Sequence, residues 1–235
     1  MNDLIKKNCT DLHLDDYFEG LPVNTFDHST GQPRHLSRSR LIKQLQVFNR
    51  ALAAYSRVLM VHVVVHFPKE VQANTLRKNG AISRYISSFQ SHVTADLRRK
   101  KSASPDVRIH GTDIRYFWAR ERDTSINEHY HIMFFLNGNT YRKAGSYNDF
   151  SCGGLFAMLN DAWSSALGLP QGFNHGLVHL AGMKQVNVHQ ITTTLIERYD
   201  MQMDSKQDAF YWLSYLAKLD SRDAGGGRSY GYSNK

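Results

Sequence analysis

Hydrophobic and polar residues follow one another along this chain in patterns that predict both helices and strands. Between residues 40 and 57, apolar side chains such as Leu41, Leu45 and Phe48 recur near the helical period, which predicts an amphipathic helix. Residues 58–67 are almost wholly apolar and β-branched and end before Pro68, which predicts an interior strand. Residues 82–97 return to helical spacing.

The second half of the chain predicts further strands and helices. Residues 114–121 and 128–136 read as two strands that pair as an antiparallel hairpin, residues 153–167 as a helix, and residues 173–188 as another hairpin. A helix holding residues 210–218 follows, started by the 204–208 region. This order predicts an α+β fold, an antiparallel sheet with helices packed mainly on one face.

Composition divides the chain into a core and two flanking segments. Residues 1–37 are polar and turn-rich and predict a loosely ordered N-terminal arm, residues 38–222 form the domain, and residues 223–235 form a basic, Gly-rich tail. With 235 residues and 41% hydrophobic content, the chain is long enough for one sizeable domain.

The charge balance favours a polyanionic partner. Lys and Arg total 29 against 21 Asp and Glu, a formal net charge of +8, which favours nucleic acid ahead of an anionic membrane surface, although a protein can also be basic without such a partner. The 12 Tyr and 12 Phe residues offer stacking surfaces for single-stranded bases, though most must pack in the core.

Cysteine usage and the apolar runs predict a cytosolic protein. Cys9 and Cys152 have no zinc-type spacing and make no disulfide framework. The longest apolar run is interrupted by His62 and His66, so we expect no membrane span.

The segment His129-Tyr130-His131 carries the most informative chemistry. Side chains alternate faces along a strand, so His129 and His131 project to one side and can share a metal ion. Glu121, across the predicted hairpin, offers the carboxylate that a two-imidazole site needs, whereas Glu128 points to the opposite face. The alternative is a pair of surface or hydrogen-bonded histidines.

Mixed nitrogen and oxygen ligands favour Mn²⁺ over Mg²⁺, although cellular abundance can reverse that order. Such a ligand set leaves positions open for water and a phosphate oxygen.

A second candidate group lies in the last predicted helix. Tyr211, Tyr215 and Lys218 are spaced i, i+4, i+7 and predict one helical stripe, in which a phenol nucleophile has an ammonium beside it. The alternative is aromatic packing, because Phe210 and Trp212 make this helix apolar nearly all round.

Three other features are weaker. His62 and His66 share a strand face and are expected to be core or near-site histidines rather than ligands. Residues 151–154 precede a helix and can bind an anion there, but they lack the lysine of a P-loop. The basic run 98–101 is either a solvated helix end or a DNA contact.

His129-Tyr130-His131, followed by Tyr215-Leu216-Ala217-Lys218, resembles the motifs of HUH endonucleases, the rolling-circle initiators and relaxases. More narrowly, residues 118–121, 129–131, 137–138 and 211–218 are similar to the inovirus and prophage YagK/YfjJ family, as is the closing segment 228–233. The resemblance covers about residues 55–235 and rests on short motifs.

That resemblance implies an RRM-like palm, with His129 and His131 binding the metal and Glu121 completing the ligand set. It implies that Tyr215 attacks a DNA phosphate, leaving a 5′-phosphotyrosine and a free 3′-OH, and that Tyr211 is a second nucleophile. The family's central motif residue is aliphatic, whereas Tyr130 stands here. No helicase region follows, so we expect unwinding by a host helicase and extension by a host polymerase.

The leading hypothesis is therefore a metal-dependent endonuclease that nicks and joins single-stranded or hairpin DNA and starts rolling-circle replication of phage or mobile DNA. One rival is a non-catalytic, DNA-binding or regulatory prophage protein with the same palm. Another is a phosphodiesterase acting on small nucleotides. Metal binding distinguishes the first two.

Overall fold

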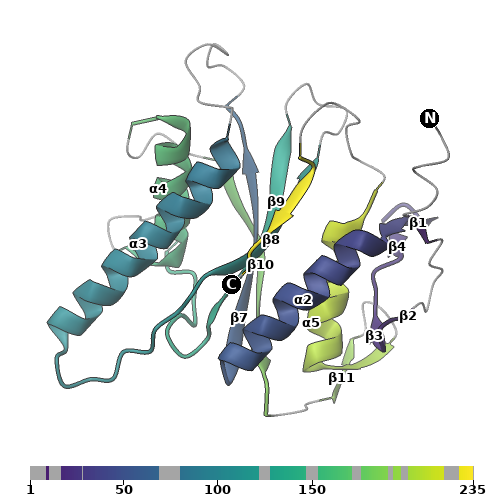
Figure 1. Cartoon of the computed structure of the whole chain (residues 1–235), viewed down its shortest axis with the longest axis horizontal. Coiled ribbons are helices and arrows are strands. Elements are labelled where there is room, and N and C mark those ends of the chain that lie inside the picture. Colours follow the sequence, from purple (N-terminus) through teal and green to yellow (C-terminus); the bar gives the residue numbers. More distant parts are fainter. Residues whose placement is uncertain are drawn as a thin grey trace.

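The centre of the molecule is a five-stranded antiparallel sheet with the order β10–β7–β9–β8–β13 (Figure 1). The computed structural model describes residues 9–10, 17–27, 29–68, 80–121, 128–146, 153–170, 176–189, 193–196, 201–219 and 228–234. The sheet strands are β7 (Arg57–His66), β8 (Arg115–Glu121), β9 (His129–Asn137), β10 (Val178–Asn187) and β13 (Tyr230–Tyr232). The predicted α+β class and antiparallel sheet are confirmed, and this sheet is compatible with an RRM-like palm.

The two strongest strand predictions are also confirmed. The apolar run predicted as an interior strand is β7, which lies between β10 and β9. The predicted histidine hairpin is the β8–β9 pair, with Trp118 opposite Ile132 and Glu121 opposite His129. Both predictions succeed because β-branched and aromatic residues fit a pleated surface that is buried on both sides.

Helices cover both faces of this sheet rather than mainly one (Figure 1). One face packs against α3 (Ala81–Ala103) and α4 (Leu155–Leu167), and the other against α2 (Arg38–Ala54) and α5 (Ser205–Ser214). The expectation of one covered face was wrong because β7 and β9 are apolar at nearly every position, and both faces of such strands need burial. Among the described residues, no helix is both long and apolar enough to span a bilayer.

The segment expected to form a hairpin over residues 173–188 is instead one long edge strand in its described part. β10 pairs with β7 from Val178 to Asn187, and its register shifts between Leu180 and Gly182. A side chain at Gly182 would lie 3.1 Å from the Trp212 ring of α5. The glycine that suggested a turn therefore marks an irregularity in the strand where the helix approaches closely.

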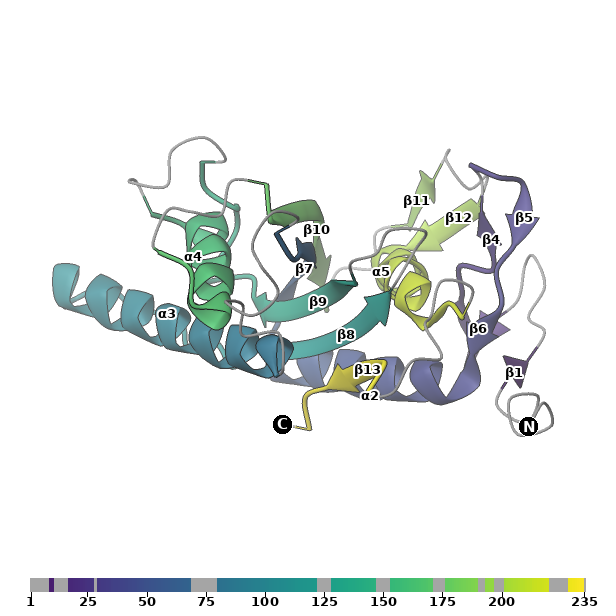
Figure 2. The same ribbon diagram turned by 90° about the horizontal axis from the view of Figure 1, so that it is seen from above.

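The described part of the N-terminal segment is paired and packed, which differs from the loosely ordered arm expected for residues 1–37. Phe18, Leu21, Val23 and Leu36 join the core on the α2/α5 side, because these scattered apolar residues find a surface in α5 and its neighbours. The short strands of this segment lie on the same side of the sheet as α5, as Figure 2 shows. They are β1 (Cys9–Thr10), β2 (Tyr17–Phe18), β3 (Leu21–Pro22), β4 (Phe26–Asp27), β5 (Gln32–Pro33) and β6 (Leu36–Ser37).

The segment expected to be a Gly-rich tail over 223–235 ends in a strand of the main sheet. β13 pairs with β8, with Gly231 opposite Trp118, and a side chain at position 231 would meet the Trp118 ring at 2.6 Å. Glycine thus permits a close approach between strand and ring. Residues 220–227, including part of the predicted tail, lie outside the described residues.

The last helix begins as predicted and ends earlier. The Asp204 side chain accepts hydrogen bonds from the backbone of Lys206 and Gln207, and the Gln207 side chain accepts one from the Asp204 backbone, which makes a capping box. α5 stops at Ser214, and a 3₁₀ turn, η2 (Tyr215–Ala217), follows. A hairpin of β11 (Thr193–Ile196) and β12 (Met201–Asp204) precedes the helix.

Candidate metal and tyrosine site

Strand register brings the predicted metal ligands together on the α2/α5 face of the sheet. Glu121 of β8 lies opposite His129 of β9, and His129 lies opposite His66 of β7. His131 is two residues further along β9, so its side chain projects from the same face. The hairpin inferred from the sequence is therefore what places the carboxylate beside both imidazoles.

The three side chains form a compact cluster. One candidate ligand atom from each of Glu121, His129 and His131 lies within 4.8 Å of the other two. The carboxylate oxygen Oε2 of Glu121 is 3.4 Å from Nε2 of His131 and 3.9 Å from Nε2 of His129. Glu121 is only 2% exposed, so a charged carboxylate here needs partners.

The electrostatics of the cluster suit metal binding. Burial and the neighbouring His131 lower the pKa of His129 despite the opposing effect of Glu121, which favours the neutral imidazole that a ligand requires. Burial alone would raise the pKa of Glu121, but its contacts with His131 and Lys218 outweigh that and hold it at about 2. A neutral imidazole at His129 and an ionised carboxylate at Glu121 are thus the states that these two residues prefer.

The tyrosine–lysine motif reaches this cluster from the C-terminal end of α5. Nζ of Lys218 donates a hydrogen bond to the hydroxyl oxygen of Tyr215 at 2.8 Å and lies 2.9 Å from Oε2 of Glu121. The Tyr215 and His131 ring centroids are 5.8 Å apart. Burial lowers the pKa of Lys218, but Glu121 and Tyr215 outweigh it and raise the net value, so the ammonium persists.

These residues fit a divalent cation in donor type and spacing. Two ligands that are each about 2.1 Å from one ion are at most about 4.2 Å apart, so a small closing movement of the cluster would suffice. The donor set contains no thiolate, which suits Mn²⁺ or Mg²⁺. Lys218 already balances the charge of Glu121, so an incoming cation would have to share that carboxylate with the ammonium.

Tyr211 and Tyr215 occupy different environments, and the predicted helical stripe through Lys218 is wrong. The α-helix ends at Ser214, and Lys218 has non-helical backbone angles, so Lys218 meets Tyr215 across the 3₁₀ turn. Tyr215 is half-buried, whereas Tyr211 is only 5% exposed. A phosphate that approaches the cluster would therefore meet Tyr215.

Further residues near the site come from the predicted N-terminal arm and from the first turn of α2. The guanidinium carbon of Arg34 lies 5.2 Å from the centroid of the Tyr215 ring, and Arg34 is itself held by an ion pair with Asp27 at 3.0 Å. Arg40 donates a hydrogen bond to the carbonyl oxygen of Lys218 at 2.9 Å.

Backbone contacts attach the same N-terminal region to the tyrosine turn. The amide of Asn24 donates to the Ser214 hydroxyl at 2.8 Å, and the amide of Leu219 donates to the carbonyl of His35 at 2.9 Å. These contacts, together with Arg34 and Arg40, form an N-terminal clamp on residues 214–219. Neither Arg34 in the polar segment nor Arg40 at the start of a predicted helix indicated the clamp, because it depends on contacts between residues far apart in sequence.

The two histidines of β7 are near-site residues, as expected. His62 is buried, and its Nε2 lies 3.1 Å from Nδ1 of His131. His66 stacks on His129, with ring centroids 5.2 Å apart. Glu128 faces away as predicted, since it contacts Arg120 and the hydroxyl of Tyr130.

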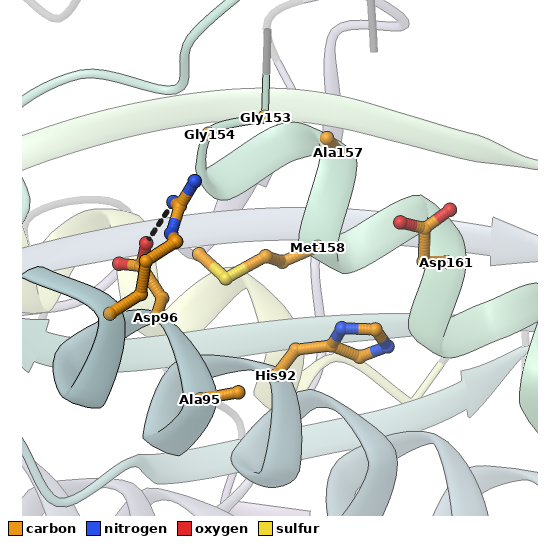
Figure 3. A pocket seen from close by; sticks show the side chains of 9 residues that line it. His92, Ala95, Asp96, Gly153, Gly154, Ala157, Met158 and Asp161 are labelled. Carbon is orange, nitrogen blue, oxygen red and sulfur yellow. Dashed lines mark hydrogen bonds and ion pairs between the residues drawn. The ribbon is translucent and has the colours of Figure 1, made fainter. Parts of the chain in front are cut away.

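A separate cavity of about 230 Å³ lies on the opposite face, between α3 and α4 (Figure 3). It includes Gly153 and Gly154 of the segment considered for anion binding, whereas Ser151 and Cys152 lie outside the described residues. Arg99 is one of the residues that line it and pairs with Asp96 at 2.6 Å. The ion pairs of Arg99 and Lys100 with Asp96 fit a solvated helix end.

Fold and site together define a mixed α+β protein whose antiparallel sheet carries a Glu–His–His cluster beside a tyrosine and a lysine. The YagK/YfjJ C-terminal domain family matches residues 23–233, and the chain belongs to that family. It is 30% identical to the uncharacterized protein YagK of Escherichia coli K12 over 186 residues, covering 76% of this chain and 84% of the relative. The uncharacterized protein YfjJ of the same organism is 28% identical over 225 residues, 89% and 99% of the two chains. No solved structure matches.

Proposed function

We propose that this protein is a metal-dependent, HUH-type endonuclease that nicks and joins single-stranded or hairpin DNA through a phosphotyrosine at Tyr215. The observation that carries the proposal is the bridge made by Lys218, whose ammonium lies within 3 Å of both the Tyr215 hydroxyl and the Glu121 carboxylate. A candidate nucleophile and a candidate cation site therefore share one side chain. The chain's net charge of +8 suits a DNA substrate.

In the proposed reaction, the Tyr215 oxygen attacks a DNA phosphorus atom and the bond from phosphorus to the 3′-oxygen breaks. The phenol proton passes to water and the departing 3′-oxygen takes up a proton, so a 5′-phosphotyrosine and a free 3′-OH result. Lys218 stabilises negative charge on the phenol oxygen and on the nearby phosphate. Attack by a 3′-OH on the phosphotyrosine reverses these steps and joins the strand.

His129, His131 and Glu121 would hold the cation beside the scissile phosphate. When bound, Mn²⁺ or Mg²⁺ supplies Lewis-acid polarisation of a phosphate oxygen. Initiation of rolling-circle replication of phage or mobile DNA is the role that we propose for this chemistry, with a host helicase and polymerase as partners.

One structural observation favours a second candidate, a DNA-binding or regulatory protein that does not cleave. The Lys218–Glu121 ion pair already satisfies the buried carboxylate with a positive charge. If the protein works with this ion pair in place, Glu121 needs no metal ion to balance its charge. Titration of the protein with Mn²⁺ in a calorimeter separates the two candidates, because only the endonuclease requires a stoichiometric site.

Covalent adduct formation tests the catalytic proposal directly. Single-stranded oligonucleotides tiled across the element that encodes the protein are incubated with it and Mn²⁺, and a denaturing gel is used to detect a protein–DNA adduct. We expect an adduct with the wild-type protein and a loss of at least about 10³-fold in its rate with Tyr215→Phe, because the phenol oxygen is the nucleophile.

The matched control is Tyr85→Phe, which removes a hydroxyl from a buried tyrosine of α3 in the core on the opposite face of the sheet. It should leave the adduct rate within about threefold of wild type. Tyr211→Phe shows whether the buried tyrosine also reacts. No adduct from any oligonucleotide, or an unchanged adduct with Tyr215→Phe, would refute the proposal.

A further inference from the structure

His62 is a buried polar residue that the proposed reaction does not use. It lies on the α2/α5 face of β7 in line with Val58 and Met60, two buried apolar residues of the same core. The side chain of His62 is itself only 6% exposed. An apolar residue would fill this place without desolvating a polar ring, so the imidazole calls for a specific partner.

That partner is a proposed metal ligand. Nε2 of His62 lies 3.1 Å from Nδ1 of His131, within hydrogen-bond distance. The other nitrogen of His131, Nε2, faces Glu121 at 3.4 Å. The two nitrogens of His131 therefore point in different directions, one toward His62 inside the protein and one toward the candidate cation site.

The hydrogen bond and the cation together determine where the protons sit. A cation takes the lone pair of Nε2 of His131, so the single proton of that neutral ring must be on Nδ1. This proton is then donated to Nε2 of His62, which acts as the acceptor and keeps its own proton on Nδ1. An acceptor that is hydrogen-bonded to a histidine ligand, and not to the cation itself, orients that ligand and increases its basicity.

Packing prevents His62 from turning away. The ring of Trp212 meets it edge-on with centroids 5.7 Å apart, and the ring of Tyr215 lies at 6.3 Å. Both neighbours belong to the helix and turn that also present the tyrosine nucleophile. His62 thus contacts both the ligand strand and the tyrosine segment.

We infer that His62 is a positioning residue, which fixes the ring and tautomer of His131 so that Nε2 is the atom offered to a divalent cation. This inference rests on the metal-binding part of the proposed function and names a residue that supports the same site. It predicts that His62 changes metal affinity without being a ligand.

Calorimetric titration with Mn²⁺ tests the inference without any DNA substrate. His62→Leu removes the acceptor and should weaken Mn²⁺ binding by about 10- to 100-fold. His62→Gln places an amide oxygen near the position of Nε2, so it should restore affinity to within about threefold of wild type. His92→Leu, on α3 at the cavity of the opposite face, is the matched control and should bind like wild type.

Ring-nitrogen NMR of the wild-type protein gives a second test that needs no substitution. With diamagnetic Zn²⁺ bound, which also accepts imidazole and carboxylate ligands, long-range proton–nitrogen correlations should show the His131 proton on Nδ1. They should show the His62 proton on Nδ1 as well. A proton on Nε2 of His62 would overturn the inference.

The outcomes separate this inference from the proposed function. If wild type binds Mn²⁺, His131→Ala abolishes binding and His62→Leu binds as wild type does, then His62 has no positioning role while the metal site stands. If wild type has no stoichiometric Mn²⁺ site, both the metal-dependent function and this inference fail. If His62→Leu does not fold, the Gln variant and the NMR measurement still decide.

Discussion

The two faces of the central sheet are built from the same strands and differ sharply in chemistry. Toward α3 and α4, β7 contributes Leu59, Val61, Val63 and Val65, and β9 is apolar in the same way. Toward α2 and α5, the same strands are apolar over part of their length and carry the histidines and the glutamate at one shared end of the sheet.

The difference shows how one sheet can serve both stability and chemistry. Alternation along a strand separates the two tasks, because neighbouring residues face opposite sides. Tyr130 is an example, since it packs in the α3/α4 core between the two candidate ligands His129 and His131. The Tyr130 side chain therefore holds β9 against the α3/α4 core, on the face opposite to the candidate ligands.

The largest expected effect comes from the apolar face. Phe134→Ala removes a fully buried ring that packs on Phe89 and Tyr85, and should lower the free energy of unfolding by about 3–5 kcal/mol. Mn²⁺ affinity, measured where the variant is still folded, should stay within about threefold of wild type.

The control for this comparison is Phe135→Ala, its neighbour on the other face. Phe135 is equally buried but belongs to the core on the face that carries the site. Phe135→Ala should lower the free energy of unfolding by a similar amount and should also weaken Mn²⁺ binding. Denaturant unfolding and calorimetry measure both quantities, and equal loss of affinity in the two variants would contradict the separation of faces.

An intermediate effect is expected at Lys218. Lys218→Met takes the ammonium away from the buried Glu121 carboxylate and should lower stability by about 1–3 kcal/mol without metal. Saturating Mn²⁺ should recover most of this loss, because the cation replaces the missing positive charge. Denaturant titrations with and without Mn²⁺ measure the recovery.

Lys100→Met is the matched control on the other face. Lys100 pairs with Asp96, which keeps Arg99 and Tyr141 as partners, so the loss should be under about 1 kcal/mol. Saturating Mn²⁺ should not change the stability loss of Lys100→Met. A loss at Lys218 that Mn²⁺ leaves unchanged would argue that Lys218 and the cation do not share Glu121.

The smallest effect is expected at the N-terminal clamp. Arg34→Met removes the guanidinium that lies against the Tyr215 ring and should slow adduct formation about tenfold, or ~1.4 kcal/mol. Mn²⁺ affinity should not change, because the ligands lie on β8 and β9. Single-turnover kinetics measure the rate.

Arg38→Met removes a similar cation-on-ring contact, with Phe18, away from the tyrosine, and serves as the control. Its adduct rate should match wild type. Equal rates in the Arg34 and Arg38 variants would show that the clamp does not position Tyr215.

The elements that the sequence predicted correctly are those determined by interactions between residues that are close together in the chain. The β7 strand, the β8–β9 hairpin and the start of α5 near Asp204 were all readable, because alternation, β-branching and helix-capping residues act over a few residues. The hairpin also placed Glu121 correctly beside His129.

Features that depend on distant contacts escaped prediction. The pairing of β13 with β8, the N-terminal clamp and the 3₁₀ turn at Tyr215 are each set by tertiary packing rather than by propensity. Gly182 misled because a glycine can mark a turn or a close approach, and only the position of Trp212 distinguishes the two.

The pairing of β13 with β8 also has a consequence for biosynthesis. β8 emerges from the ribosome long before residues 230–232, and until then its outer backbone edge has no neighbour. A nascent chain therefore carries an open strand edge beside Glu121 through much of its translation, a state that invites pairing with other chains. Slow translation or stalling between these two strands should thus favour aggregation during synthesis, even though the finished fold covers that edge.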